Sequence, residues 1–535
     1  MIQSRRFLAF AAATLVALLL VKYFWSLALF PGVPFGYDAG IYRYLFLKHA
    51  EAFPPVMMTA LPPWAASHPL GLFFFSTLAL RLGIPVDWLI GWIWNLFPVV
   101  LAATLARVTA KRSTPLMGLC VLLVCLLSPV QYQGFLMIYW KVFVALLWCV
   151  LSFDAFDRGQ KRWIIYGMFV VATHQQIGLV FLLATLSSVI TLPQKIPRLR
   201  MLGEWLAAML LGLLWYIPNA RYAFGDILPL LATPTALFAF LGVLVIGIGT
   251  VTAAVRFPVS RKPIFVLVCI AVAAGALLLP LTGTAPEFLD KMLLKLAQGE
   301  QNPGAFFTVP EYLQASLPLL LLGVAGFLLS LRKQRGTPAQ WAAVWCALAV
   351  VSMFFFYRRF LLPLDFFLLP FAALALHEAW LQWRKSVMAL ALAAVLAQSW
   401  LTTDQIRQID PHVERSMLIS FTVLPSVVHP GSRVIVLDTM APWVVGFLPE
   451  NNVSGPGIFD SLPLESWQAF FYGSTAERQR FISNYPAGTY FLATDVFRSF
   501  YPPQVQTLLM DPCFRPTLFP GLLVSVCGPS AAVQP

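Results

Sequence analysis

Long runs of apolar residues, separated by short polar connections, repeat along the first three quarters of the chain. An α-helix needs roughly 17–25 apolar residues to cross the roughly 30 Å hydrocarbon core of a bilayer. On this pattern we place thirteen crossings, at residues 7–30, 85–107, 115–132, 137–153, 163–174, 176–192, 203–219, 229–254, 263–283, 313–331, 339–356, 360–377 and 387–402. The pattern therefore predicts an all-α polytopic membrane bundle of about 13 transmembrane helices.

One stretch of this pattern allows two topologies. Between the crossings at 163–174 and 176–192 stands Thr173-His174-Gln175-Gln176, which is too polar to face lipid. Backbone that leaves the helix at membrane depth is tolerated only where protein or water covers it, so we expect a tight outward-facing hairpin. If residues 163–192 form one helix instead, the C-terminal tail lies in the cytoplasm.

Two outward segments are long enough to carry structure of their own. The first, residues 31–84, contains the apolar run Leu70–Leu82, which is too short to span a bilayer comfortably. We expect two short helices that lie at the membrane interface there. The second, residues 284–312, has apolar positions at helical spacing with charges opposite, which predicts another interfacial helix or else an ordinary connecting loop.

The C-terminal tail, residues 403–535, differs from the membrane domain at 1–402 by its short apolar segments and frequent Pro and Gly. Short apolar runs bounded by turn residues are typical of buried strands in a soluble domain. We expect strands at Arg433–Asp438 and Gly488–Asp495 and helices at Leu464–Tyr472 and Thr475–Ser483. The tail is therefore predicted to be a small extracytoplasmic α/β domain.

The composition supports a membrane protein, and the positions of Lys and Arg indicate which loops lie on which side of the membrane. Hydrophobic residues make up 59% of the chain and charged residues 11%, against roughly 45–50% and about 25% in soluble domains. Compact Lys and Arg clusters fall in alternate loops, which places those loops and the N-terminus in the cytoplasm. An odd number of crossings then puts the tail outside, so we expect a bacterial inner membrane protein with a periplasmic C-terminal domain.

The net charge of +13 does not indicate a nucleic-acid partner. Residues 403–535 carry more acidic than basic side chains, so the positive charge belongs to the membrane part. Basic cytoplasmic loops that face anionic lipid explain most of it.

Two of the seven cysteines, Cys513 and Cys527, lie in the tail, and the other five fall inside predicted crossings. In an oxidising compartment, two cysteines 14 residues apart can close a disulfide. Two free thiols are the alternative.

A single acid, Asp38, follows the first crossing, in the segment Gly36–Tyr44. An unpaired, unsolvated charge at the mouth of an apolar bundle costs several kcal/mol. A carboxylate at this position is therefore expected to serve chemistry, an ion pathway or an ion pair.

Further polar side chains are expected near the outer membrane face. They are Tyr42, Arg43, His49, Glu51, His68, Lys141, His174, Gln175, Arg221, Arg358 and Arg359, with Asp365 one turn deeper. One acid and at least four bases at one level suit a reaction in which an anionic group leaves a membrane-held donor. The cations would stabilise the departing phosphate, and the carboxylate would remove a proton from the attacking hydroxyl.

Each of these residues also has a structural explanation. Arg43, His49 and Glu51 can solvate one face of a helix. Asp365 can neutralise one of the paired arginines, since acids within a membrane usually find a partner. Lys141 can extend its ammonium to the membrane interface.

Four motifs occur in a characteristic order. They are Tyr37-Asp38 with Tyr42, His68-Pro69-Leu70-Gly71, Ala172-Thr173-His174-Gln175, and Tyr357-Arg358-Arg359-Phe360-Leu361-Leu362-Pro363. Their order resembles the GT-C superfamily of polyprenyl-phosphate-sugar-dependent glycosyltransferases, which includes protein O-mannosyltransferases, aminoarabinose transferases and lipopolysaccharide-core transferases. The likeness covers about residues 7–402, and the tail adds nothing to it.

The resemblance implies roles for these residues. Asp38 would be the general base, and Asp365 is a candidate second acid. The donor phosphate would be bound by Lys141, His174, Arg358 and Arg359. Other substrate contacts are expected from Tyr37, Tyr42, Arg43, Glu51, His68, Gln175 and Arg221.

This chain departs from its relatives at the start of the fourth crossing, where they often carry a second acid and it has Lys141. A lysine there cannot act as a base or metal ligand at neutral pH. No spacing of metal ligands is visible in the chain, so no metal or other cofactor is expected, although a divalent metal is not excluded by the pattern.

We therefore expect an inverting glycosyltransferase. Its donor would be a sugar on a polyprenyl phosphate, and its acceptor a hydroxyl of a glycan, lipid or protein at the outer membrane face. The alternative is a transporter or flippase for lipid-linked glycans. Transporters often show repeated halves, and no internal repeat is visible here.

Overall fold

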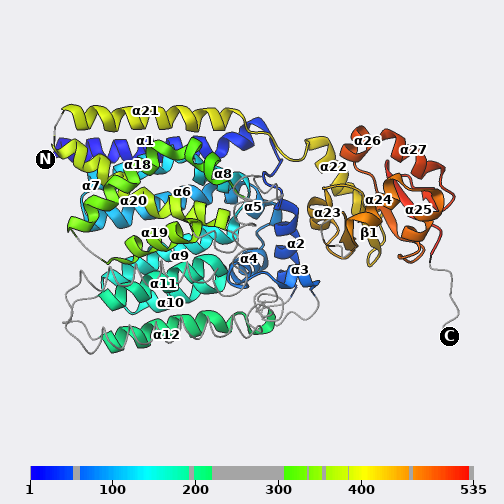
Figure 1. Cartoon of the computed structure of the whole chain (residues 1–535), viewed down its shortest axis with the longest axis horizontal. Helices are drawn as coiled ribbons and strands as arrows, with labels where there is room; N and C mark the ends of the chain where they lie inside the picture. Colours follow the sequence, from blue (N-terminus) through cyan, green and yellow to red (C-terminus); the bar gives the residue numbers. More distant parts are fainter. Residues whose placement is uncertain are drawn as a thin grey trace, which may run out of the picture. The chain divides into compact units, whose positions relative to one another are not determined.

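The computed structural model describes residues 2–51, 61–191, 198–219, 306–333, 336–351, 357–382, 385–456, 459 and 462–528. Figure 1 shows the helices and strands coloured along the chain. The predicted crossings at 229–254 and 263–283, most of the second outer segment and Arg221 lie outside the described residues.

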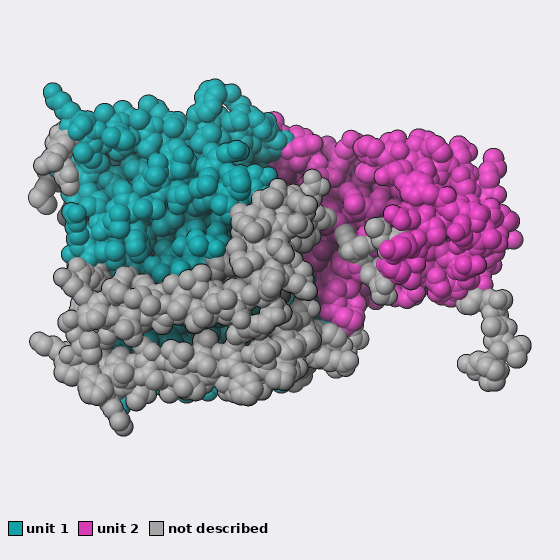
Figure 2. All heavy atoms as spheres, viewed as in Figure 1, with its two compact units in different colours: residues 1–25, 65–75, 94–409 teal, residues 26–64, 76–93, 410–535 magenta. Residues whose placement is uncertain are grey.

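The chain forms two compact units, which Figure 2 shows in teal and magenta. Unit 1 contains residues 1–25, 65–75 and 94–409, and unit 2 contains residues 26–64, 76–93 and 410–535. Most of the first outer segment therefore belongs, by its contacts, to the same unit as the tail. The predicted domain boundary between residues 402 and 403 stays a prediction.

Unit 1 is a bundle of mostly apolar helices. They are α1 (Ile2–Leu29), α6 (Trp92–Arg112), α7 (Pro115–Leu127), α8 (Pro129–Leu136), α9 (Trp140–Asp157), α10 (Arg162–Thr173), α11 (Gln175–Thr191), α12 (Arg198–Leu214), α18 (Val309–Lys333), α19 (Pro338–Val351), α20 (Leu361–Gln382) and α21 (Lys385–Arg407), with the 3-10 helices η2 (Ile217–Asn219) and η4 (Tyr357–Phe360). Helix α20 packs against α7, α18 and α19, and most of its length is buried. It therefore forms the centre of the bundle (Figure 1).

Five of the described helices are long and apolar enough to cross a bilayer, namely α1, α6, α18, α20 with η4, and α21. A sixth span results if the bent pair α7 and α8 counts as one. The polytopic helical class is confirmed, but the described residues do not support thirteen crossings. One reason is that apolar runs are interrupted: the run at 115–132 bends by 56° where Pro129 begins α8.

The run at 163–192 is divided at His174, whose extended backbone (φ −152°, ψ 122°) ends α10. Helix α11 begins at the next residue, and α10 packs against α11. This arrangement agrees with the predicted hairpin rather than with one long helix.

The break between α7 and α8 frees carbonyl groups at the end of α7 inside the bundle. The buried Lys22 of α1 donates from Nζ to the carbonyl oxygens of Leu126 and Ser128, both at 2.8 Å. Thr402 of α21 donates to the carbonyl of Leu127. These bonds satisfy the end of α7 with groups from two other helices, as an apolar environment requires.

The start of α8 is satisfied from the opposite side of the break. Ser128 Oγ accepts a hydrogen bond from the backbone N–H of Gln131 at 3.0 Å and donates to Asp365 Oδ2 at 2.8 Å. The side chain of Gln131 donates to the same carboxylate oxygen at 2.8 Å. Asp365, on α20, is therefore a buried acceptor that ties the broken span to the central helix.

Unit 2 combines the first outer segment with the tail. Its elements are α2 (Ala39–Ala50), α5 (Val86–Ile90), α22 (Arg415–Val423), η5 (Leu424–Ser426), β1 (Arg433–Val436), α23 (Ala441–Phe447), β2 (Asn452–Ser454), α24 (Leu464–Tyr472), α25 (Thr475–Ile482), β3 (Tyr490–Leu492), α26 (Asp495–Phe500), α27 (Pro502–Met510), β4 (Phe514–Pro516) and β5 (Leu522–Ser525). Two further helices, α3 (Pro63–Ala66) and α4 (Gly71–Arg81), are divided between the units, and the last four residues of α1 and the first two of α6 also belong to unit 2.

The five strands form one sheet in the order β2-β1-β3-β5-β4. Strand β1 pairs in parallel with β2 and β3, and β5 pairs antiparallel with β3 and β4. Aromatic side chains of α24 cover the sheet: Phe470 packs on the sheet residue Phe491, and Trp467 packs on Phe470. The predicted α/β tail is confirmed, and α24 has the predicted bounds.

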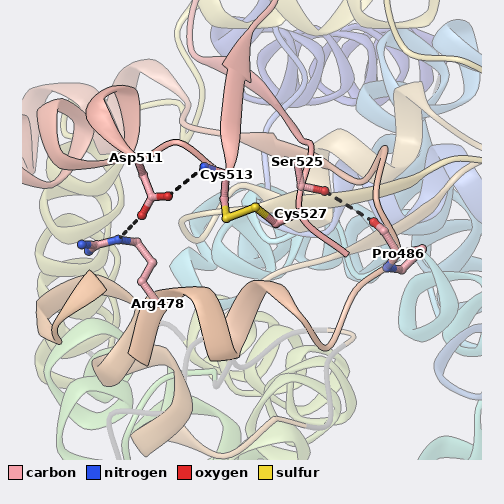
Figure 3. The surroundings of a disulfide bond; sticks show 6 residues. All are labelled: Arg478, Pro486, Asp511, Cys513, Ser525 and Cys527. Atoms are coloured by element: carbon pink, nitrogen blue, oxygen red, sulfur yellow. Dashed lines mark hydrogen bonds and ion pairs between the residues drawn. A yellow bond between two sulfur atoms is a disulfide. The ribbon is translucent and has the colours of Figure 1, made fainter. Parts of the chain in front are cut away.

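A disulfide joins Cys513 to Cys527 (Figure 3). Beside it, the buried carboxylate of Asp511 accepts hydrogen bonds from Arg478 Nε at 2.9 Å and from the backbone N–H of Cys513 at 3.0 Å. The covalent bond closes the segment that contains β4 and β5. Of the two alternatives for these cysteines, the structure shows the bonded one.

Removal of the Asp365 carboxylate should destabilise the bundle. Asp365→Ala leaves the buried Ser128 hydroxyl without its acceptor and the Gln131 amide with only the carbonyl of Leu362, and each such loss costs about 1–3 kcal/mol. Asp365→Asn keeps an acceptor oxygen and should cost less. Thermal unfolding in detergent would measure this order, and an Ala variant as stable as the Asn variant would contradict it.

Loss of the disulfide should destabilise the tail. Opening a loop of this length costs about 3 kcal/mol in the chain-entropy account. The double variant Cys513→Ser/Cys527→Ser should therefore unfold its tail at a lower denaturant concentration than the wild type. A thiol reductant should lower the wild-type transition and leave that of the double variant unchanged, and equal transitions for both proteins would exclude this role.

Candidate functional site

His68 and Lys141 meet in unit 1 although 73 residues separate them. His68 lies in the turn before α4, and Lys141 lies in the first turn of α9. Lys141 Nζ is 2.6 Å from His68 Nδ1. An ammonium has only donors, so Nδ1 accepts, and a neutral imidazole then carries its hydrogen on Nε2.

The turn that carries His68 is fixed by Asn219 of η2. The side-chain amide of Asn219 donates to the carbonyl oxygens of Ala66 and His68, both at 2.8 Å. Ala66 ends α3 and His68 lies in the turn that leads into α4, so the path of this turn depends on a residue far along the chain. Sequence patterns gave no sign of this role for Asn219.

Lys141 is placed by an unusual helix end. Helix α8 closes with backbone bonds from Ile138 to Phe135 at 2.9 Å and from Tyr139 to Gly134 at 3.2 Å, the pattern of a Schellman motif. The left-handed position in that motif is usually glycine, but here it is the buried Ile138, with φ 56°. This conformation costs about 1–2 kcal/mol, and it lets α9 begin two residues later with Lys141 in its first turn.

His174 occupies the break between α10 and α11. Its Nδ1 accepts a hydrogen bond from the backbone N–H of Ile177 at 3.3 Å, so the neutral ring also presents its hydrogen on Nε2. The charges of Lys141 and Arg359 act on this imidazole. His174 therefore belongs to the same group of side chains as His68, Lys141 and Arg359.

The start of α4 packs directly on the end of α10. A Cβ at Gly71 would lie 2.7 Å from the carbonyl oxygen of Ala172 and 2.8 Å from Thr173 Oγ1. Glycine is therefore required for this close approach. His68 precedes the start of α4, Lys141 lies in the first turn of α9, and His174 precedes the start of α11. Three helix N-termini therefore lie beside these side chains.

This arrangement suits an anion. The N-terminus of a helix carries about half a positive charge and unsatisfied backbone N–H groups. Three such ends lie in the region where Lys141, Arg359 and two Nε2–H groups provide hydrogen-bond donors. A phosphate group, which offers only acceptors when it is ionised, fits this chemistry. We name His68, Lys141, His174 and Arg359 the anion cluster.

The two arginines of η4 differ in their surroundings. Arg359 is exposed, whereas Arg358 donates from Nε to the carbonyl of Phe307 at 3.2 Å and lies 4.0 Å from the carboxylate of Glu311. Arg358 is therefore engaged at the start of α18.

The carboxylate of Asp365 accepts hydrogen bonds from Ser128 and Gln131, so it belongs to the break between α7 and α8.

Asp38 belongs to unit 2, where it precedes the first residue of α2. Its side chain is partly exposed and makes no capping bond to the helix. The neighbouring Tyr37 donates from its hydroxyl to the carbonyl of Thr439 at 3.1 Å. Burial, with help from the carboxylates of Asp38 and Asp438, raises the pKa of Tyr37 to about 12, so this donor stays protonated at neutral pH.

Several residues of unit 2 that were predicted to contact substrate contact other residues of the protein. Arg43 donates from Nε to Asp87 at 2.9 Å, and Glu51 accepts from Lys48 at 2.8 Å. Tyr42 is buried, with its ring 5.8 Å from that of Phe46. Their predicted roles as substrate contacts stay predictions.

His49 corrects the expectation of a solvated helix face. Its side chain is buried, and burial lowers the pKa of His49 to about 3. The imidazole is therefore neutral at physiological pH.

Sequence reasoning also missed His412, in the tail. Its ring lies 6.3 Å from that of Tyr37, edge to face, and the charge of Asp38 acts on it. The contact crosses 375 residues, so no local pattern could have indicated it.

The predicted site is thus brought together in two separate sets. His68, Lys141, His174 and Arg359 gather in unit 1, and Tyr37, Asp38, Tyr42, Arg43 and Glu51 lie in unit 2. The expectation that both sets serve one pocket stays a prediction.

Gln175, the first residue of α11, is exposed. Among the described residues, no three His, Cys, Asp or Glu side chains are grouped so that they could hold a metal ion.

No family model matches the chain, and no curated protein matches it. Solved structures do. The chain is similar to the oligosaccharyltransferase of Archaeoglobus fulgidus in its apo form, with a TM-score of 0.60 and 14% identity over 92% of this chain and 71% of that one.

Two further structures of the same archaeal enzyme give a TM-score of 0.56 each. One is a complex with zinc and sulfate, at 13% identity over 91% of this chain and 69% of that one. The other is tethered through a disulfide to an acceptor peptide with the NVT sequon, at 14% identity over 92% and 70%. At this identity the likeness shows the fold alone.

Loss of the Lys141 charge should weaken anion binding. Hydrogen bonds to charged groups contribute about 1.5–3 kcal/mol, which corresponds to roughly 10–100-fold in Kd. Lys141→Gln should therefore bind a soluble alkyl phosphate more weakly by that factor in calorimetry. Lys111→Gln removes an exposed lysine at the end of α6 and should bind as the wild type does. Equal affinities for all three proteins would exclude Lys141 from anion binding.

Proposed function

We propose that this protein is a membrane glycosyltransferase that moves a sugar from a polyprenyl-phosphate donor to an acceptor hydroxyl, with inversion. The observation that carries the proposal is the anion cluster, in which His68, Lys141, His174 and Arg359 gather within an apolar bundle. The fold shared with an oligosaccharyltransferase supports it. Because a fold alone does not imply a function, the chemistry of the cluster has to support the reaction.

The anion cluster would hold the donor phosphate. As the bond between the sugar's anomeric carbon and the phosphate oxygen breaks, negative charge develops on that oxygen. Lys141 and Arg359 would stabilise this charge, and the Nε2–H groups of His68 and His174 would donate to it. These donors supply the positive charge that a divalent metal provides in other phosphate sites, so we propose metal-free transfer.

Asp38 would act as the general base. The acceptor oxygen forms its bond to the anomeric carbon on the face opposite the departing phosphate, and its proton passes to the Asp38 carboxylate. The acceptor would be a hydroxyl of a glycan, lipid or protein, since a hydroxyl is a weak nucleophile that needs such help. We place the reaction at the outer face of a bacterial inner membrane, with the N-terminus cytoplasmic and the tail periplasmic.

Asp38→Asn should lower the transfer rate by roughly 10²–10⁴, the usual contribution of a general base. The donor KM should change little, because the donor phosphate is bound elsewhere. Purified protein in nanodiscs, supplied with radiolabelled lipid-phosphate sugars, would give both constants.

Asp404→Asn is a matched control, because Asp404 is an exposed acid on α21. It should transfer sugar at the wild-type rate. A wild-type rate for Asp38→Asn would remove Asp38 from the mechanism. A wild-type protein that moves lipid-linked glycans across vesicles without transferring sugar would favour a flippase.

A further inference from the structure

Helix α23 of the tail crosses helix α2 of the first outer segment at backbone distance, and both belong to unit 2. A Cβ at Gly446 would lie 2.5 Å from the carbonyl oxygen of Gly40 and 2.8 Å from its Cα. A Cβ at Gly40 would lie 2.2 Å from the carbonyl oxygen of Pro442. All these neighbours are backbone atoms, which cannot turn aside as a side chain can. The crossing therefore requires glycine on both helices.

Side chains secure this crossing along the length of α2. Arg43 donates to the carbonyl of Gly446 and lies over the ring of Phe447 at 4.7 Å. Near the end of α2, Lys48 pairs with Glu450 at 2.9 Å. The tail thus contacts α2 at its beginning, middle and end.

Asp38 lies between two of these contacts. Tyr37, one residue earlier, donates to Thr439 of the tail, and Gly40, two residues later, is the crossing point. The backbone of Asp38 is therefore held on both sides by elements of the tail.

We propose that Gly446 is a positioning residue, through which the C-terminal domain fixes the place of the Asp38 carboxylate. This inference rests on the proposed function and assigns a role to the domain. Ordinary contact for a Cβ begins at about 3.4 Å, against 2.5 Å here, so Gly446→Ala must displace α2 or α23 by roughly an ångström. A misplacement of that size at a reacting group can lower a rate by about 10²-fold.

The test uses Gly446→Ala in the full chain, in nanodiscs. We expect kcat to fall about 10–100-fold with an unchanged donor KM, and the α2 amides to exchange hydrogen faster. Gly203→Ala is the matched control, since Gly203 is also helical and a Cβ there would meet nothing within 4 Å. It should match the wild type in kcat and in the exchange of α2.

A double variant separates positioning from general damage. If Gly446 acts through Asp38, then Gly446→Ala should lower the rate little further in the Asp38→Asn background, because the group it places is already gone. An undiminished second loss would overturn the proposal, as would faster exchange in α2 with a wild-type kcat.

Should Gly446→Ala not fold, Tyr37→Phe removes only the bond to Thr439 and should lower kcat severalfold without changing donor KM. An unchanged kcat in that variant would overturn the proposal too. The proposed function fails separately: a wild-type protein that transfers no sugar would contradict it, while the exchange of α2 would still report whether the tail holds that helix.

Discussion

A helix that breaks inside an apolar bundle has to satisfy its free backbone groups within the protein, and much of unit 1 follows from this constraint. At the break before α8, Lys22 and Thr402 satisfy the carbonyls that α7 leaves open, and Ser128 caps the helix that follows. At the second break, His174 caps α11 with its own ring nitrogen. Such breaks create helix N-termini at bundle depth, which are ready positions for an anion.

The same constraint separates two sets of charged groups that look alike in the sequence. Lys22 and Asp365 are both buried and are engaged at the first break. Lys141 and Arg359 lie with the second break, beside the histidines. In this chain the bonds of Lys22 and Asp365 identify the structural set.

The sequence predicted the elements whose signals are local. Helix α24 has the predicted bounds, the hairpin at His174 is present, and β1 and β3 fall within the predicted strands. The four residues of the anion cluster were also candidates, because a charge in an apolar run is conspicuous. The count of crossings was less reliable, since hydropathy does not register a bend such as that at Pro129.

What the sequence could not predict depends on contacts between distant segments. The guanidinium of Arg43 is directed to the tail, but nothing near residue 43 indicates Gly446 as its partner. Asn219 and His412 are ordinary polar residues until the fold brings them to His68 and Tyr37. Ile138 adopts a backbone conformation that its side chain disfavours, so its sequence pattern argued against the turn that it makes.

The division of the chain into units has a consequence for the proposed enzyme. The groups that would bind the donor phosphate are positioned by helices of the bundle, whereas the proposed base is positioned by the tail. Under the proposed mechanism, substitutions in the tail would alter proton transfer from the acceptor without altering how the donor is held. In the proposed mechanism the tail would contribute to the acceptor half of the reaction through the placement of α2, even though it carries none of the motifs that indicated the reaction.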